Sequence, residues 1–193
     1  MFYLLFSVIA YLFGSFPSAL IIGKLFYQID IREHGSGNLG ATNAFRVLGV
    51  KVGLIVTIFD ILKGTIPVVM VVVLAPELQP LIVGGFAVIG HIFPIFAKFK
   101  GGKAVATSGG VLLGVSPVLF AILIGSFFIF LKLFKYVSLA SILVGLTAVV
   151  TSVIMQDIPL IIVTCFFAFF VIYRHTDNIK RIKNKTEPKI TWL

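Results

Sequence analysis

The stretch that decides the fold is residues 104–131, which read AVATSGGVLLGVSPVLFAILIGSFFIFL without a single charge. As one α-helix these 28 residues would rise about 42 Å, whereas about 20 residues suffice to cross the hydrocarbon of a bilayer. The segment Gly114-Val-Ser-Pro117 also breaks the stretch. Lys103 precedes it and Lys132 follows it, so the positive-inside rule places both ends in the cytoplasm. We therefore predict two crossings, the first of them a short helix at residues 104–114.

Five further apolar stretches are predicted to be membrane helices, at residues 1–23, 52–76, 78–97, 136–156 and 158–173. The first has no basic leader, so we interpret it as an uncleaved span and not as a signal peptide. Together with the two crossings above, the sequence predicts an all-α polytopic membrane protein with seven transmembrane helices, forming a single domain over residues 1–193. The alternative is five spans, with the short helix and its neighbour forming a re-entrant pair.

The composition excludes an ordinary soluble domain. Of the 193 residues, 59% are hydrophobic and only 12% are charged, and the mean hydropathy is +1.13. A soluble domain has about 45–50% apolar and about 25% charged residues. The one cysteine, Cys165, excludes disulfides within the chain and cysteine-based metal sites. Since Cys165 lies inside an apolar run, we interpret it as a packing residue.

The charges predict the orientation of the chain. There are 16 Lys and Arg residues against 7 Asp and Glu residues, for a net charge of +9. The predicted outer segments, residues 76–80, 115–117 and 155–159, contain Glu77 and Asp157 but no Lys or Arg. The N terminus is therefore expected outside and the C terminus in the cytoplasm. Polar chemistry is then expected in three cytoplasmic segments, residues 28–51, 98–108 and 174–187.

The first polar segment contains the sequence HGSGNLGATNAFR at residues 34–46. Its glycines can turn backbone N–H groups toward an anion, and Arg46 can bind phosphate through two hydrogen bonds. The side chains that could add hydrogen bonds are Ser36, Asn38, Thr42 and Asn43. An alternative interpretation is a polar turn that caps a helix and carries a positive-inside arginine.

A dinucleotide-binding fold is excluded for this segment. Gly35, Gly37 and Gly40 match the pattern G-x-G-x-x-G, and Asp60 lies 20 residues further on. That motif requires a preceding strand and a βαβ unit. The 24 residues of 28–51, between two membrane helices, cannot hold one.

The second polar segment contains FKGGKAVAT at residues 99–107. It leads into the short helix, so Gly101, Gly102 and Lys103 are expected at the positive end of the helix dipole, where anions bind. It lacks the G-x-x-x-x-G-K-[ST] spacing of a Walker A loop. The alternative is a basic turn that only anchors the topology, an interpretation that suits Lys98 and Lys100.

The third polar segment begins with RHTDNIKR at residues 174–181 and is predicted to extend the last membrane helix into the cytoplasm. At helical spacing His175, Asn178 and either Arg181 or Ile182 share a face, so the first two can approach one ligand. The alternative is a solvated basic tail. We apply that interpretation to Lys183, Lys185 and Lys189.

These three segments resemble the three motifs of the bacterial glycerol-3-phosphate acyltransferases that use acyl phosphate as donor. That family carries GSGN-x-GATN-x-x-R, a KGGKG-VAT-like segment and H-x-x-NI-x-R…E, in this order. The resemblance covers essentially the whole chain. Two positions depart from it, because Ala104 and Lys185 stand where the family usually has glycine; the second of these precedes Thr186 and Glu187.

The resemblance implies transfer of a fatty acyl group from acyl phosphate to the 1-hydroxyl of sn-glycerol 3-phosphate, giving lysophosphatidate and inorganic phosphate, the first step of phospholipid biosynthesis. It implies a multi-pass protein of the bacterial cytoplasmic (inner) membrane with its active site on the cytoplasmic side. It further implies no cofactor, no metal, no nucleic acid, and the acyl-phosphate-forming enzyme as a candidate partner. The implied catalytic residues are Ser36, Arg46, Lys103, His175 and Asn178. The implied substrate-binding and phosphate-binding residues are Gly35, Gly37, Asn38, Gly40, Thr42, Asn43, Gly101, Gly102, Thr107, Ser141, Arg181 and Glu187.

Three other polar residues lie within predicted spans. Asp60 and Lys63 are three residues apart in a helix and are expected to form a buried ion pair that helps to position the first polar segment. His91 is interpreted as a hydrogen-bonded residue between helices. No histidine is followed by aspartate at H-x-x-x-x-D spacing, which excludes the acyltransferase mechanism based on that pair.

The proton of the attacking hydroxyl is expected to go to a substrate phosphate oxygen, whose second pKa near 6 suits this role. On this hypothesis His175 and Asn178, with Ser36, orient the substrates. Two other functional classes stay open: a membrane transporter of anions or organophosphates, and a phospholipid-binding regulator without chemistry. A transporter should place polar groups near the midplane or at both ends, whereas here they gather on one side.

Overall fold

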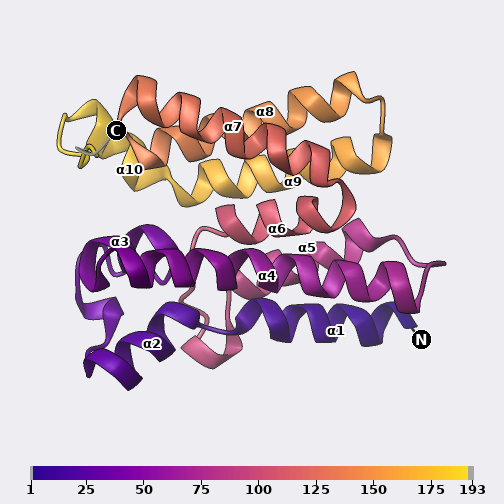
Figure 1. Ribbon diagram of the computed structural model, residues 1–193, viewed down its shortest axis with the longest axis horizontal. Coiled ribbons are helices and arrows are strands. Elements are labelled where there is room, and N and C mark those ends of the chain that lie inside the picture. The colour runs from indigo at the N-terminus through magenta and orange to yellow at the C-terminus, as the bar shows by residue number, and fades with distance from the viewer. Residues whose placement is uncertain (1, 191–193) are drawn as a thin grey trace. The chain divides into compact units, whose positions relative to one another are not determined.

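The computed structural model describes residues 2–190, and the chain divides into two compact units, Met1–Val115 and Ser116–Leu193. As predicted, the regular structure of the described residues is helical (Figure 1). The first unit contains α1 (Phe2–Ser15), α2 (Ser18–Tyr27), η1 (Ile31–Glu33), α3 (Ala41–Leu48), α4 (Val50–Leu74), α5 (Pro80–Ile92), η2 (Ile95–Ala97) and α6 (Val105–Val115). The second contains α7 (Pro117–Phe134), α8 (Val137–Ile154), α9 (Ile158–Arg174) and α10 (Thr176–Lys183). A single functional domain stays a prediction.

Several helices are long and apolar enough to cross a membrane. Among the described residues there are five such stretches, or six if the bent pair α9–α10 counts as one span. The helix α6 is apolar but has only 11 residues. The protein is thus a multi-pass membrane protein, while the count of seven crossings and the orientation of the termini stay predictions. The five stretches are Phe2–Tyr27, Val50–Leu74, Pro80–Ala97, Pro117–Phe134 and Val137–Ile154.

The break predicted within residues 104–131 is confirmed. Helix α6 ends at Val115 and α7 begins at Pro117. Between them, the hydroxyl of Ser116 accepts a hydrogen bond from the backbone N–H of Leu119 at 3.3 Å and so caps α7. Proline suits the first position of α7, because it has no backbone N–H that would need a hydrogen-bond partner there.

A second break divides the first apolar stretch, which was expected to be one continuous helix. Helix α1 ends at Ser15 and α2 begins at Ser18. Pro17 has no N–H to donate and disfavours the helical conformation of the residue before it, so the helix stops here. The break exposes the backbone carbonyl of Phe16, which accepts a hydrogen bond from the side chain of Lys63 at 2.9 Å.

The third polar segment does not continue the last membrane helix, contrary to expectation. Helices α9 and α10 meet at His175 with a bend of 55°. The Nδ1 atom of His175 donates to the carbonyl of Val171 at 2.7 Å, and its backbone N–H bonds to Ile172 at 3.0 Å. In a continuous helix the backbone N–H of residue 175 would bond to residue 171. The imidazole takes that carbonyl instead, and the chain turns.

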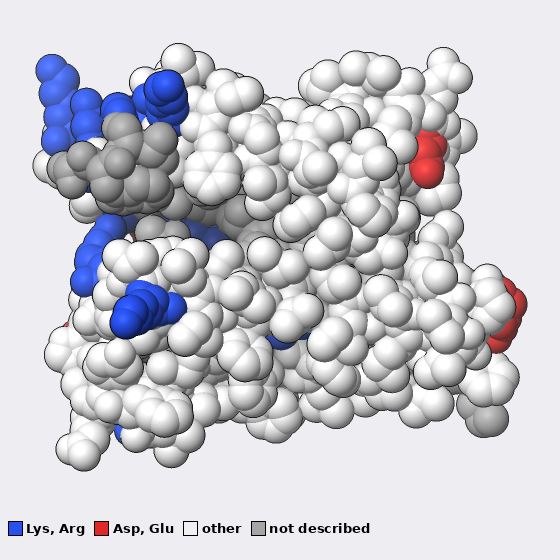
Figure 2. Space-filling view, viewed as in Figure 1, with Lys and Arg blue, Asp and Glu red and all other residues white. Residues whose placement is uncertain are grey.

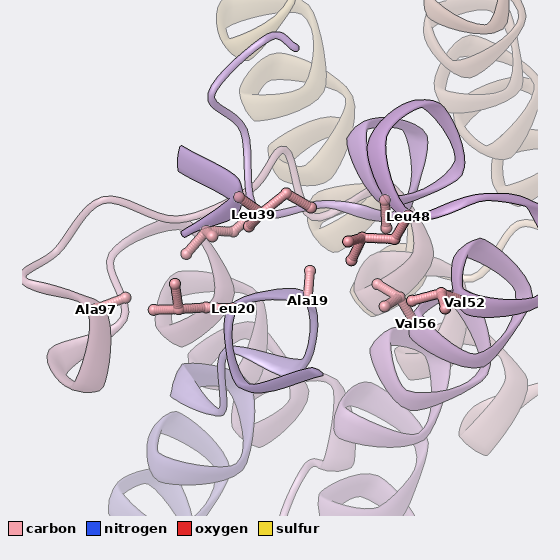
Figure 3. Packing of buried hydrophobic residues seen from close by; sticks show 9 residues of the cluster. Ala19, Leu20, Leu39, Leu48, Val52, Val56 and Ala97 are labelled. Carbon is pink, nitrogen blue, oxygen red and sulfur yellow. The ribbon is translucent and has the colours of Figure 1, made fainter. Parts of the chain in front are cut away.

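The first polar segment is anchored on an apolar core of the first unit. Ile31 and Leu39, which belong to this segment, are buried in one cluster with residues of α2, α3 and α4. Figure 3 shows Leu39 in this cluster. The buried side chains of Ile31 and Leu39 hold the glycines between and beyond them in place, although that part of the chain has no regular secondary structure. The nine buried residues of this cluster are Ala19, Leu20, Ile31, Leu39, Ala44, Leu48, Val52, Val56 and Ala97.

Helix α6 packs on α4 through direct contact of their backbones. A Cβ atom on Gly64 would lie 2.2 Å from the carbonyl oxygen of Thr107, and one on Gly110 would lie 1.9 Å from that of Ile61. The hydroxyl of Thr65 donates to the carbonyl of Gly110 at 2.8 Å. Small residues allow this close approach between membrane helices. The start of α6 is therefore fixed relative to α4.

Within each unit, most of the Lys and Arg side chains visible in Figure 2 lie at one end, and the larger acidic patch visible there lies at the other. The basic segments themselves contain the acidic residues Asp30, Glu33, Asp177 and Glu187. The turn between α4 and α5 contains Glu77, and the turn between α8 and α9 contains Asp157. Neither turn contains a Lys or Arg residue. This segregation agrees with the predicted outer and cytoplasmic ends.

Candidate active site

The side chain of Asn43 organises the first polar segment. It is 1% exposed. Its oxygen accepts a hydrogen bond from the backbone N–H of Ser36 at 2.9 Å, and its nitrogen donates to the carbonyls of Ile31 at 3.2 Å and His34 at 3.1 Å. Both polar ends of the amide thus hold the loop together. A direct contact of Asn43 with phosphate stays a prediction.

The glycines of this loop serve its shape. Gly35 and Gly37 have φ of 61° and 68°, in the left-handed region where a Cβ is disfavoured. The backbone N–H of Gly37 donates to His34 at 3.0 Å, and that of Gly40 donates to the side-chain oxygen of Asn38 at 2.8 Å. These N–H groups are engaged within the loop, so the expected row of N–H donors facing an anion is not observed at these positions.

The polar groups that the loop presents are side chains. Ser36, Thr42 and Arg46 are exposed, and within residues 2–190 no other residue forms a hydrogen bond or ion pair with their side chains. Arg46 lies on α3, one turn beyond Asn43, and so on a helix whose start is fixed by the loop. The segment therefore offers a guanidinium and two hydroxyls to a ligand, on a rigid base.

The arginine that precedes the loop is already neutralised. Arg32 binds both carboxylate oxygens of Asp30, at 2.9 and 2.6 Å, and Lys24 lies 3.4 Å from the same carboxylate. The hydrogen bond from Arg32 is the main reason that the pKa of Asp30 lies well below its ordinary value. These contacts with Asp30 close the turn at η1. Arg46 is therefore the arginine of the first polar segment that is available to bind an anion.

The two glycines of the second polar segment fit around His91. The backbone N–H of Gly102 donates to the carbonyl of His91 at 3.1 Å. A Cβ on Gly101 would lie 2.0 Å from that carbonyl oxygen, and one on Gly102 would lie 2.0 Å from the ring Nε2. Both glycines are therefore required by close packing, whatever their relation to phosphate. Lys103 follows them and is half-buried, directly before α6.

Thr107 lies in the interior of the first unit. It is fully buried, and its hydroxyl is 3.1 Å from Nδ1 of His91. We predicted a substrate contact for this residue from the motif. The structure shows an internal partner, which connects the first turn of α6 to α5.

The third polar segment is gathered by Glu187. Its carboxylate accepts hydrogen bonds from Asn178 at 2.6 Å, Arg181 at 2.7 Å and Ser138 at 2.8 Å. Partial burial raises the pKa of Glu187, but these three hydrogen bonds outweigh burial and leave the pKa lowered. Asn178 and Arg181 are thus brought together on α10 by this carboxylate, whereas the approach of His175 and Asn178 to one ligand stays a prediction.

The two serines at the start of α8 have different partners. The hydroxyl of Ser141, proposed as a substrate contact, is buried and donates to the carbonyl of Val137 at 2.8 Å, within its own helix. The hydroxyl of Ser138 reaches Glu187. Sequence reasoning missed the role of Ser138, because only the fold brings residues 138 and 187 together. Among the described residues, no group of three or more His, Cys, Asp or Glu side chains could hold a metal ion.

Comparison with known proteins shows the family of the chain. The family model described as glycerol-3-phosphate acyltransferase matches residues 4–185. The chain belongs to this family. The glycerol-3-phosphate acyltransferase of Bacillus subtilis (strain 168) is 60% identical over 186 residues, covering 96% of each chain. That of Geobacillus kaustophilus (strain HTA426) is 53% identical over 186 residues, covering 96% of this chain and 94% of the relative.

A solved structure has the same fold. It is the crystal structure of PlsY (YgiH), an integral membrane glycerol 3-phosphate acyltransferase, in its glycerol 3-phosphate form. It is 34% identical with a TM-score of 0.94, covering 99% of this chain and 96% of its own. The form of that protein with lysophosphatidic acid gives a TM-score of 0.91 at the same identity and coverage.

Both departures of this acyltransferase from the family motifs lie at left-handed backbone positions. Ala104 and Lys185 each have φ of 58°. Glycine adopts this conformation without steric cost, whereas other residues pay about 1–2 kcal/mol. With Lys185 at this position, Glu187 accepts a hydrogen bond from Asn178. The departure therefore bears on local stability and is compatible with this contact.

Proposed function

We propose that the chain transfers an acyl group from acyl phosphate to the 1-hydroxyl of sn-glycerol 3-phosphate, giving lysophosphatidate and inorganic phosphate. Membership of the glycerol-3-phosphate acyltransferase family supports the acceptor and the reaction. The related crystal structures are the glycerol 3-phosphate form and the lysophosphatidic acid form of that protein. All three motifs of the family that uses acyl phosphate occur in the chain, which supports this donor.

The observation that carries the proposal is the state of the first polar segment. The side-chain amide of Asn43 is hydrogen-bonded within the loop. In contrast, the side chains of Arg46, Ser36 and Thr42 are exposed and have no hydrogen-bond or ion-pair partner among the described residues. A rigid loop with an exposed guanidinium and hydroxyls suits a phosphate group, because arginine binds phosphate through two parallel hydrogen bonds. We assign Arg46 and Lys103 to the phosphates of the substrates.

The chemistry needs no covalent enzyme intermediate. The 1-hydroxyl oxygen of glycerol 3-phosphate attacks the acyl carbonyl carbon, the bond from that carbon to the bridging oxygen breaks, and phosphate leaves with the electron pair. The hydroxyl proton goes to a phosphate oxygen of a substrate, whose second pKa near 6 allows this. His175 and Asn178 bind and orient the substrates by hydrogen bonding, together with Ser36.

The reaction is proposed for the cytoplasmic side of the bacterial inner membrane. The segregation of basic residues in each unit supports this, since basic residues face the cytoplasm. Acyl phosphate is a reactive mixed anhydride that water hydrolyses, so direct transfer from the enzyme that forms it would protect it. We include that enzyme as a candidate partner.

Phosphate release by the purified protein tests the proposal. The protein in detergent micelles is incubated with palmitoyl phosphate, with and without sn-glycerol 3-phosphate, and inorganic phosphate and lysophosphatidate are measured. We expect both products in equal amounts only when both substrates are present. Uptake of glycerol 3-phosphate into proteoliposomes without product formation would indicate a transporter, and binding without either would indicate a regulator. Both outcomes would overturn the proposal.

A further inference from the structure

A network of buried polar side chains lies inside the first unit, on α4. Asp60 and Lys63 form an ion pair with an Nζ to Oδ1 distance of 2.7 Å, and they are 1% and 6% exposed. The hydroxyl of Ser18 donates to the same carboxylate oxygen at 2.8 Å. Lys63 also donates to the carbonyl of Phe16 at 2.9 Å. The pair thus joins α4 to the break between α1 and α2.

The network continues through α5 to the second polar segment. Nζ of Lys63 lies 3.3 Å from Nδ1 of His91, and the hydroxyl of Thr107 lies 3.1 Å from the same nitrogen. An ammonium group only donates hydrogen bonds, so Nδ1 of His91 accepts from Lys63, and the other ring nitrogen is Nε2. That nitrogen lies against Gly102, whose backbone N–H donates to the carbonyl of the same histidine.

Lys103 is therefore held from both sides. Gly102, the residue before it, donates a backbone hydrogen bond to His91. Helix α6, which follows it, is joined to the network through the hydroxyl of Thr107. The carbonyl of Thr107 also touches α4 at Gly64, where a Cβ atom would approach to 2.2 Å. A shift of the ring of His91 would move the loop that carries Lys103.

Stability alone explains such a network poorly. Charges inside a membrane are costly, and buried ion pairs in proteins can often be replaced by apolar residues without loss of stability. Here the donors of Lys63 are distributed over three acceptors from three different places in the chain: Asp60, the carbonyl of Phe16 and His91. Hydrogen bonds are directional, so this arrangement fixes an orientation that apolar packing would not.

We propose that Asp60, Lys63 and His91 are positioning residues for acyl transfer, which hold the loop of Gly101, Gly102 and Lys103 in its phosphate-binding position. This inference rests on the function proposed above, and it adds residues that lie outside the three motifs. It also revises the expected role of the ion pair, whose observed partners lie at the break between α1 and α2 and on His91. The three residues act through Lys103 and do not touch substrate.

Substitutions of His91 test the proposal. In His91→Asn the side-chain oxygen takes the place of Nδ1 and still accepts from Lys63, whereas His91→Leu has no acceptor. We expect the KM for glycerol 3-phosphate or acyl phosphate to rise about tenfold or more in His91→Leu, as for a lost charged hydrogen bond, with substantial recovery in His91→Asn. Amide hydrogen exchange in the peptide covering residues 99–107 should quicken in His91→Leu.

A second variant keeps the test valid if single substitutions unfold the protein. Asp60→Asn combined with Lys63→Met removes both charges, so no unpaired charge stays buried. We expect this double variant to fold with near wild-type thermal stability, but to show the raised KM and the faster exchange at residues 99–107. A folded double variant with wild-type KM values and wild-type exchange would overturn the proposal.

The matched control is the hydroxyl pair of Ser152 and Thr164, which joins α8 to α9 at 2.9 Å and is equally buried. Ser152→Ala should lower thermal stability without changing either KM or the exchange of residues 99–107. Equal changes in this control would show a general structural effect and overturn the proposal. Hydrogen exchange does not depend on turnover, so a failure of the proposed function, with no product from the wild-type protein, is distinguishable from a failure of the positioning role.

Discussion

The amide nitrogen of Asn178 donates to the carboxylate of Glu187 at 2.6 Å. Asn178 belongs to the motif that we assign to substrate binding, whereas Glu187 lies beyond the end of α10. The carboxylate also accepts from Arg181 and Ser138. It thus links the tail, α10 and the start of α8, and it sets the orientation of Asn178. These hydrogen bonds shape the third polar segment, while a contact of Glu187 with substrate stays a prediction.

Loss of the Glu187 carboxylate should change the dependence of stability on pH. The pKa of this group is lowered in the folded protein, from an ordinary value of 4.5. Its contribution to stability is therefore fully present above that value and is lost as the pH falls through the lower folded pKa. We expect the melting temperature of the wild-type protein to fall more steeply below pH 4.5 than that of Glu187→Gln. Parallel curves for the two proteins would contradict this assignment.

Replacing Lys185 by glycine should stabilise the protein. Lys185 has φ of 58°, and a side chain there costs about 1–2 kcal/mol, of which the greater flexibility of glycine in the unfolded chain cancels a part. We expect a gain of about 1 kcal/mol in Lys185→Gly, measured by thermal or denaturant unfolding in detergent. Lys180→Gly, within α10, is the control and should lose about 1 kcal/mol, because glycine is unfavourable inside a helix. Destabilisation by both substitutions would refute the strain argument.

Arg46→Ala and Lys103→Ala should each reduce kcat/KM strongly without unfolding the protein. On the proposed function, each substitution removes a charged hydrogen bond to phosphate, worth about 1.5–3 kcal/mol, or a loss of about 10- to 100-fold. Lys183→Ala is the control, since this residue is exposed at the end of α10 and we assign it to the solvated tail. Steady-state kinetics with both substrates gives the measurement. Normal turnover in Lys103→Ala would remove the basis for a phosphate site at the second segment.

Substitution of His175 separates its two roles. Nδ1 donates to the carbonyl of Val171, so His175→Asn retains a donor at that position while it removes Nε2. If a substrate phosphate takes the proton, both His175→Asn and His175→Ala should lose activity mainly through substrate binding, and high glycerol 3-phosphate should restore much of kcat. Unchanged KM values with kcat reduced about a thousandfold would instead identify the histidine as the general base.

The predicted topology can be tested with single cysteines at Glu77, Ser116 and Asp157 in a Cys165→Ser background. All three lie in turns without Lys or Arg, between α4 and α5, before α7, and between α8 and α9. We expect a membrane-impermeant thiol reagent to label them from outside intact cells. Labelling of Ser116→Cys from the cytoplasmic side alone would mean that α6 and α7 do not both cross the membrane.

The sequence by itself determined the helical membrane fold and the segments in which chemistry could lie. Uncharged stretches of about 20 residues allow little else in a bilayer, and the break at Pro117 follows from the chemistry of proline. The sequence also singled out Arg46 as a candidate phosphate ligand, because glycine-rich turns with an arginine are typical of phosphate sites; that role stays a prediction. These are local properties, which depend on composition and on spacing along the chain.

Only the tertiary structure decided which polar side chains are already hydrogen-bonded inside the protein. Asn43 belongs to the same motif as Arg46 and Thr107 belongs to the second motif, yet the polar atoms of both are used inside the protein. The contacts of Ser138 with Glu187 and of Lys63 with His91 join residues 49 and 28 positions apart. No periodicity connects residues at such separations. A buried polar atom takes whichever partner the fold brings near, because leaving it unpaired in an apolar interior is costly.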